Sequence, residues 1–323
     1  MNRISVISFS LLLLTVILHQ RTADAVDMYP SKPIRFVVPF PPGGSDTVAR
    51  ILAQKLSTSM NQSFIIDNRA GAGGLLGSAI AAKSAPDVYT LLFATPSYPI
   101  NANLYSKLQF DPVKDFSAIA LICSGPESLV VSASVSARSV QEFIDLAKAK
   151  PGVLNYASTG TGSITHLAGE LFTSMSGISL IHVPYKGTGE AMTQTMGGQV
   201  QAAFVPIGAA LPFARAGKLR ILGVGSMKRS PIDPNVPTIA EAGIPGYEVL
   251  TWYGVLAPAR TSFRVVSRLN SEINAILVQA DMLKQLSALG FDATPGTPEE
   301  FDRYLKAEIK KWGVLVSKLG LRQ

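Results

Sequence analysis

The stretch IRFVVPFPPGGSDTVAR, residues 34–50, runs from an apolar segment through a proline- and glycine-rich turn into the start of a helix. IRFVV (34–38) is almost continuously apolar, as in a strand of a parallel sheet that is covered on both faces. After the turn, Val48, Ile51 and Leu52 recur at three- and four-residue spacing, which predicts a helix with one buried stripe. The stretch therefore predicts a β-loop-α unit of an α/β fold.

The same unit repeats over the next fifty residues. FIID (64–67) leads into NRAGAGGLLG (68–77), which opens a second helix, and VYTLLFA (88–94) predicts a third strand. The order βαβαβ predicts a parallel sheet with helices on its faces. Each glycine-rich turn follows a strand, at the sheet edge where open α/β sheets bind ligands.

Two long apolar stretches interrupt this alternation. One covers residues 119–132, broken only by Gly125-Pro126-Glu127, and the other is VLTWYGVLA (249–257). We predict that both cross between two domains and form a hinge. Domain 1 then consists of 26–123 and 250–323, and domain 2 of 124–249.

The segment between the crossings repeats the βα alternation. Capping boxes begin at Ser139 and Thr238. After the second crossing only helices are expected, near 263–278 and after the capping box at Thr297, and we expect them to pack on the first sheet because they bring no strands of their own. The predicted strands of the segment are 154–158, 179–183, 200–205 and 219–224.

The N-terminus has the pattern of a secretory signal peptide. Arg3 precedes an apolar run, and small residues Ala23 and Ala25 predict cleavage after Ala25, so the mature protein is expected to be exported to an oxidising compartment. The single cysteine, Cys123, excludes an intrachain disulfide. The net charge is +7, but the basic residues are scattered, so no nucleic-acid partner is expected. We expect a monomer.

Four glycine-rich loops, two in each domain, predict an anion site between the domains. They are PFPPGGS (39–45), NRAGAGG (68–74), YASTGTGS (156–163) and VPYKGTG (183–189). Helix N-termini offer free backbone amides and partial positive charge, which favour anions. One such loop alone is equally well explained as an ordinary βα turn, but four in two domains favour the anion site.

The patterns of enzymes are missing from this sequence. GAGGLLG lacks the lysine of a P-loop, no dinucleotide GxGxxG pattern or GxSxG elbow occurs, and no set of residues forms a nucleophile, base and orienting group. His166 and His182 do not form a zinc pattern with one cysteine, and His182 lies in an apolar strand, typical of a core histidine. We predict no catalysis, no cofactor and no metal.

Eight ordered motifs run along the chain: PFPPGGSDTVAR, NRAGAGGLLG, YASTGTGSITHLAGELF, HVPYKGTGEAM, GGQV, RAGKLRILGV, VPTIAEAGIPGYEV and WYGVLAPA. They closely resemble those of the substrate-binding proteins of tripartite tricarboxylate transporters, the Bug family, over essentially all of the mature chain, which the resemblance places in the periplasm. The resemblance implies a type II periplasmic-binding-protein fold, in which two βα lobes joined by a two-strand hinge close on a small organic carboxylate in the interdomain cleft. It also implies membrane permease subunits as partners.

The resemblance implies three groups of ligand-binding residues. The first-domain loops bind one carboxylate mainly through backbone groups, and the second-domain loop faces the far part of the ligand. A variable segment follows the third strand, where Tyr98 either stacks on the ligand or is an ordinary surface tyrosine. The implied residues are Pro41, Gly43, Gly44, Ala70, Ala72, Gly73 and Gly74; Thr95, Ser97 and Tyr98; and Ser158, Thr159, Gly160, Thr161, Gly162, Phe204 and Val205.

The sequence departs from the family at two positions where an aspartate is frequent. Gln201 follows GGQV, and Val205 and Pro206 follow Phe204. The loss of an acidic group argues against a ligand with an ammonium group, so we hypothesise a dicarboxylate, tricarboxylate or aromatic acid. A ligand sensor for a two-component kinase and an exported enzyme remain the alternatives to a transport receptor.

Overall fold

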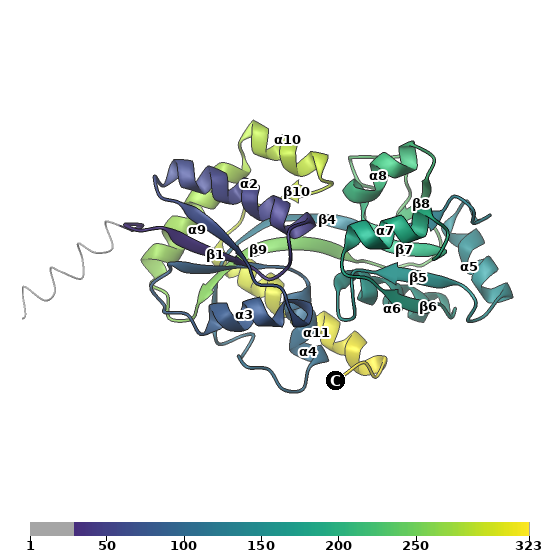
Figure 1. The fold of residues 1–323 in the computed structure, drawn as a ribbon, viewed down its shortest axis with the longest axis horizontal. Helices are drawn as coiled ribbons and strands as arrows, with labels where there is room; N and C mark the ends of the chain where they lie inside the picture. The colour runs from purple at the N-terminus through teal and green to yellow at the C-terminus, as the bar shows by residue number, and fades with distance from the viewer. Residues whose placement is uncertain (1–28, 323) are drawn as a thin grey trace, which may run out of the picture.

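The computed structural model describes residues 29–322. The predicted signal peptide lies outside this range. The chain forms two lobes that share one continuous set of paired strands (Figure 1). In the first lobe β1 pairs in parallel with β2 and β3, as the βαβαβ pattern predicts, and β9 pairs antiparallel with β3 and β4. These strands are β1 (Ile34–Val38), β2 (Phe64–Asn68), β3 (Thr90–Ala94), β4 (Phe116–Ser132) and β9 (Leu250–Pro258).

The second lobe is built on the far half of β4. There β4 pairs antiparallel with β7 and β8, while β5 lies parallel between β7 and β6. Each predicted strand of this segment is present. The strands are β5 (Asn155–Ser158), β6 (Ile181–Pro184), β7 (Ala202–Pro206) and β8 (Leu219–Val224).

The long strand β4 changes partners at one point in its length. Residues up to Pro126 pair with β9, and from Glu127 onward β4 pairs with β7 and β8. Figure 1 shows β4 and β9 running side by side between the lobes. The two apolar stretches therefore cross between the lobes, and their continuous burial explains why neither alternates polar and apolar residues.

Helices cover both faces of the first sheet. Successive side chains of a strand point to opposite faces, and in β1 the side chains on both faces are apolar and buried. Phe36 and Val38 pack with α2, α9 and α10, whereas Val37 packs with α3 and α11. The second lobe has the same layers, with α5 and α6 on one face and α7 and α8 on the other. The helices are α2 (Gly44–Ser59), α3 (Leu75–Ala82), α5 (Val140–Ala149), α6 (Ile164–Ser176), α7 (Thr188–Met196), α8 (Ile207–Arg215), α9 (Phe263–Leu277), α10 (Ala280–Ala288) and α11 (Pro298–Lys318).

The last helix departs from the sequence-based expectation. Its first half packs on the first sheet, but Trp312, Leu315 and Val316 belong to the core of the second lobe. α4 (Ser97–Leu104) joins the same core through Ile100 and Leu104. α4 and the end of α11 therefore connect the lobes outside the two crossing strands.

Two local predictions also need correction. The sequence pattern missed α10 and the short strand β10 (Asp292–Ala293), which pairs with β4. At Thr238 both hydrogen bonds of a capping box form with Glu241, but only turns follow. A capping box stabilises the start of a helix, and Gly243 with Pro245 close behind prevents its continuation.

Candidate functional site

The first candidate loop joins β1 to α2. α2 begins at Gly44, and no side chain caps it at Gly43; the first helical bond runs from Thr47 N to Gly43 O at 2.8 Å. The backbone N–H groups of residues 44–46 therefore have no partner within the helix. Of these residues Gly44 is exposed and Ser45 partly exposed, whereas Asp46 is buried; Pro41 and Gly43 beside them are exposed as well.

The second candidate loop joins β2 to α3 through η1 (Ala72–Gly74). Gly73 and Gly74 have φ angles of 62° and 98°, in the left-handed region that glycine adopts without strain. The turn is closed by a 3.0 Å bond from Gly74 N to Gly71 O. Ala70 and Ala72 are exposed beside it.

Asn68 joins the two loops. Its Nδ2 donates at 2.9 Å to Phe40 O in the first loop and at 2.9 Å to Asp46 Oδ1 in α2. Arg50 in turn donates to both side chains, at 2.8 Å to Asp46 Oδ2 and at 3.3 Å to Asn68 Oδ1. The loops are thus held in one arrangement before any ligand arrives.

The cations nearest these loops are already paired. Arg50 pairs with Asp46, and Arg35 and Arg69 both pair with Asp67. Burial tends to raise the pKa of Asp67, but hydrogen bonds from the two arginines outweigh it and lower the pKa. An anion at these loops would be bound by backbone amides and dipoles, not by a free cation.

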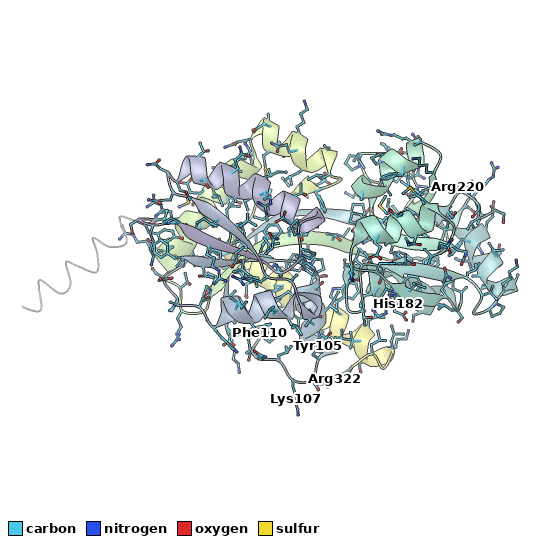
Figure 2. The ribbon with its side chains drawn as sticks, in the orientation of Figure 1. Tyr105, Lys107, Phe110, His182, Arg220 and Arg322 are labelled. Atoms are coloured by element: carbon cyan, nitrogen blue, oxygen red, sulfur yellow. The ribbon has the colours of Figure 1, made fainter. Side chains whose placement is uncertain are left out.

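The segment after β3 brings polar side chains toward the second loop. Thr95 and Ser97 are buried, and their hydroxyls make no hydrogen bond to another described residue. Tyr98 is also buried, so the alternative of a surface tyrosine is wrong. Its hydroxyl donates to Pro112 O at 2.7 Å, and its ring stacks on Phe110, which Figure 2 labels in the loop after α4.

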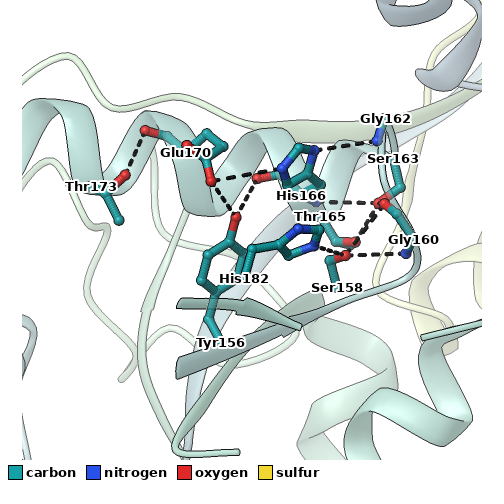
Figure 3. A network of polar contacts seen from close by, with 10 residues as sticks. All are labelled: Tyr156, Ser158, Gly160, Gly162, Ser163, Thr165, His166, Glu170, Thr173 and His182. Atoms are coloured by element: carbon teal, nitrogen blue, oxygen red, sulfur yellow. Dashed lines mark hydrogen bonds and ion pairs between the residues drawn. The ribbon is translucent and has the colours of Figure 1, made fainter. Parts of the chain in front are cut away.

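The second-lobe loop turns its hydroxyls inward. Ser158 is fully buried, with Oγ 2.6 Å from His182 Nε2 (Figure 3). Thr159 bonds to Thr165, and Ser163 caps α6 through His166 N at 3.2 Å. Of the predicted residues in this loop, Thr161 is the exposed one, while Gly160 is partly exposed and Gly162 is buried.

Two stacked imidazole rings form hydrogen bonds to this loop from the interior of the second lobe. His166 and His182 have ring centroids 4.0 Å apart, and Gly162 N donates to His166 Nδ1 at 3.3 Å (Figure 3). The pKa of both histidines is lowered to about 4, in each case mainly by burial, and in His182 also by the neighbouring His166. Both rings are therefore neutral at neutral pH, so His166 Nδ1 is able to accept.

Phe204 and Val205 lie at the end of β7, beside the end of β5 where the loop 156–163 begins, because Ala202 and Ala203 pair with Tyr156 and Ala157. Both are fully buried, Phe204 against Tyr156 and Phe172, and Val205 in the core under α7 and α8. Their side chains belong to the core of a strand that is covered on both faces, and their assignment to the ligand site stays a prediction. The two core clusters lie on opposite faces of β7.

The loops of the two lobes meet. A Cβ on Gly73 would lie 4.0 Å from Thr161 O, and one on Gly162 would lie 3.4 Å from Asn101 Oδ1. A small hollow opens beside this contact. It brings together five of the predicted residues and adds Asn101, which no sequence signal singled out; its lining is Pro39, Gly73, Gly74, Ser78, Ala94, Thr95, Ser97, Tyr98 and Asn101.

Within residues 29–322 no three histidine, cysteine, aspartate or glutamate side chains are grouped closely enough to hold a metal ion. Among the same residues, no helix combines the length and apolar character needed to span a bilayer. The lining of the hollow contains no charged side chain. Such a lining provides hydrogen bonds but no charge of its own.

Known proteins resemble this chain over most of its length. Residues 48–321 match the family model described as tripartite tricarboxylate transporter family receptor. A protein from Pseudomonas sp. (strain P51), encoded in the tcbD-tcbE intergenic region, is 39% identical over 296 residues, which cover 91% of this chain and 88% of that protein.

Two solved structures have nearly the same fold. R. palustris Rpa4515 with adipate is 35% identical with a TM-score of 0.85, covering 90% of this chain and 98% of that one. MatC from Rhodopseudomonas palustris with bound malate is 31% identical with a TM-score of 0.82, covering 89% and 100%. The fold class expected from the sequence, that of type II periplasmic binding proteins, is confirmed.

Proposed function

Because this chain belongs to the tripartite tricarboxylate transporter receptor family, we propose that it is a periplasmic receptor that binds a small organic carboxylate between its lobes and delivers it to the permease subunits of such a transporter. One observation carries the proposal. The two first-lobe loops are joined through Asn68, each leads into the N-terminus of a helix, and the second of them reaches the second-lobe loop at Thr161.

The proposed contacts are mainly with backbone groups. Free N–H groups at the start of α2 and at Gly73 donate to one carboxylate, and each helix end contributes about 0.3–1 kcal/mol to an anion. Pro41, Gly43, Gly44, Ala70 and Ala72 form the outer rim of this group. Thr161 in the second lobe faces the remainder of the ligand.

Lobe closure completes the proposed mechanism. β4 and β9 act as the hinge, and the loops at Gly73 and Thr161 approach each other as the lobes close. We infer that the receptor works as a monomer after removal of residues 1–25. A ligand that touches both lobes then favours the closed form, which the permease recognises by its differential contacts.

The ligand class follows from the charge of the site. Gln201 exchanges backbone-to-side-chain hydrogen bonds of 3.1 Å with Asn155, so it ties β7 to β5 and offers no carboxylate for an ammonium group. Adipate and malate, held by the two similar structures, are dicarboxylates without an amino group. We therefore propose a dicarboxylate, tricarboxylate or aromatic acid as ligand.

A thermal-shift screen of the chain from residue 26 to residue 323 tests the proposal. The panel contains dicarboxylates, tricarboxylates, aromatic acids, aspartate and glutamate. An acid at 100 times its Kd should stabilise the protein by about 2.7 kcal/mol. If aspartate or glutamate bind tightly and the other acids do not, the proposed ligand class is wrong; if none binds, the receptor proposal fails.

A further inference from the structure

Asn101 lies between the glycine loops of the two lobes. Its Nδ2 donates to Gly73 O at 2.8 Å, and its Oδ1 is on the side of Gly162. The bond to Gly73 fixes the orientation of the amide, because a carbonyl accepts only from the nitrogen. Asn101 is 2% exposed, yet its Oδ1 has no hydrogen-bond donor among the described residues.

The neighbouring donors are engaged elsewhere. The N–H of Gly162 points to His166 Nδ1 at 3.3 Å, and the hydroxyl of Ser163 donates to Gly160 O at 2.6 Å. A buried acceptor without a donor loses its bond to water and gains none in return, so most buried polar atoms in proteins are paired. An external donor would remove this cost.

The hollow beside Asn101 provides the rest of a binding site. Thr95 and Ser97 line it with hydroxyls that no described residue engages, and these donate readily to a carboxylate. Asn101 Oδ1 only accepts. With no charged side chain in the lining, an ammonium donor would be desolvated without a counter-ion, whereas a hydroxyl would not.

We propose that Asn101 Oδ1 accepts a hydrogen bond from a ligand hydroxyl, so that the protein selects hydroxycarboxylates with the hydroxyl next to the carboxylate. The spacing supports this position. Ser97 and Asn101 are four residues apart on α4, so their Cβ atoms are about 5–6 Å apart on one helix face. A carboxylate oxygen and the hydroxyl on the adjacent carbon are close enough together to reach both side chains. The inference rests on the proposed function and names the ligand class of that same site.

Calorimetric titration with matched acids tests the inference. The pairs differ only in one hydroxyl: malate and succinate, 2-hydroxyglutarate and glutarate, mandelate and phenylacetate. In at least one pair the wild-type protein should bind the hydroxy acid about tenfold more tightly or better. This comparison requires no variant, so it does not depend on whether a substitution folds.

Two substitutions assign the preference to Asn101. In Asn101→Leu the two acids of the pair should bind within about twofold of each other, mainly because the hydroxy acid loses affinity. Asn103→Leu is the matched control on the same helix, since the Asn103 amide donates to Pro99 O and Ile309 O and does not line the hollow. It should keep the wild-type preference.

The other outcomes separate the two proposals. If wild-type protein binds succinate, glutarate or phenylacetate as tightly as the hydroxy partner in every pair that binds, the role of Asn101 is refuted and the receptor function stands. A preference that survives in Asn101→Leu refutes it as well. If none of the six acids and none of the wider panel binds, both proposals fail.

Discussion

Asn68 Nδ2 and Asp46 Oδ1 are 2.9 Å apart, and through this bond the loop after β2 is attached to the first turn of α2. The same nitrogen also donates to Phe40 O. One side chain thus connects both halves of the proposed carboxylate site. Among the described residues, no other side chain of one loop bonds to the other loop. Arg50 of α2 adds a hydrogen bond to Asn68.

We expect Asn68→Ala to lower the free energy of unfolding by about 1–3 kcal/mol, because Phe40 O and Asp46 each lose a donor. Acid binding should weaken as well, since the loops lose their fixed arrangement. Urea denaturation and calorimetry measure the two effects. Asn235→Ala, at an exposed asparagine, is the control and should change neither.

Gly44→Asp should affect stability and binding in opposite directions. Gly44 begins α2, and a Cβ there would meet no atom within 4 Å. A carboxylate at the helix N-terminus stabilises the ligand-free protein by about 0.3–1 kcal/mol, but its charge should weaken carboxylate binding at least tenfold by repulsion. Gly44→Asn has nearly the same shape without the charge and should bind almost normally. Equal binding by both variants would place the anion elsewhere.

Gly208→Ala tests the approach of the lobes. A Cβ on Gly208, at the start of α8, would collide with the backbone of Leu289 and Gly290 in the first lobe. Backbone atoms cannot rotate away, so we expect the lobes to separate: small-angle scattering should give a larger radius of gyration and acid affinity should fall. Gly197→Ala is the control, because its Cβ makes ordinary contacts and its φ is −73°. An unchanged radius of gyration would contradict the proposed closure.

Glu127 should make stability depend on pH. It is fully buried where β4 changes partners, it accepts from Thr251, and burial raises its pKa from 4.5 to about 7. Its stabilising contribution is fully present below pH 4.5 and is lost as the pH rises to 7. The carboxyl ionises at a lower pH in the unfolded protein than in the folded protein, so rising pH favours unfolding. At about 1.4 kcal/mol per pH unit, the loss is on the order of 3 kcal/mol.

Glu127→Gln should remove this loss. Urea denaturation at pH 4.5, 6 and 7.5 should show the variant gaining stability relative to wild type as pH rises. Glu272→Gln, at a partly exposed position on α9, should follow the wild-type curve. A constant difference between Glu127→Gln and wild type at all three pH values would show that the pKa of Glu127 is the same in the folded and the unfolded protein, and so is not raised by burial.

The two stacked histidines should titrate far below the usual pKa of 6.5. Burial lowers the pKa of His166 and His182 to about 4, so their stabilising contribution is present above pH 6.5 and is lost as pH falls toward 4. The chain from residue 26 contains only these two histidines, so two NMR ring signals report on them. We expect both to keep the neutral chemical shift down to about pH 5. A midpoint above pH 6 for either would contradict the buried, neutral pair.

The sequence predicted well those features that depend on neighbours a few residues away. Thr297 and Glu300 form both bonds of the capping box, and the turn after β1 leads into a helix that begins at Gly44, as the apolar spacing of Val48 and Leu52 predicts. Apolar periodicity predicted each strand of the second lobe. These features rest on short-range hydrogen bonds and on side-chain periodicity, which adjacent residues determine.

Tertiary contacts decided what the loops present to a ligand. Asn101 reaches Gly73 across 28 residues and Thr251 reaches Glu127 across 124, distances that no local pattern encodes. The hydroxyls at Ser158 and Ser163 looked available in the sequence but turn inward to His182 and to the start of α6. By itself the sequence determined the two-lobed fold and the glycine loops; packing between distant segments decided which polar atoms remain free, because each hydrogen bond within the protein uses a group that a ligand would otherwise bind.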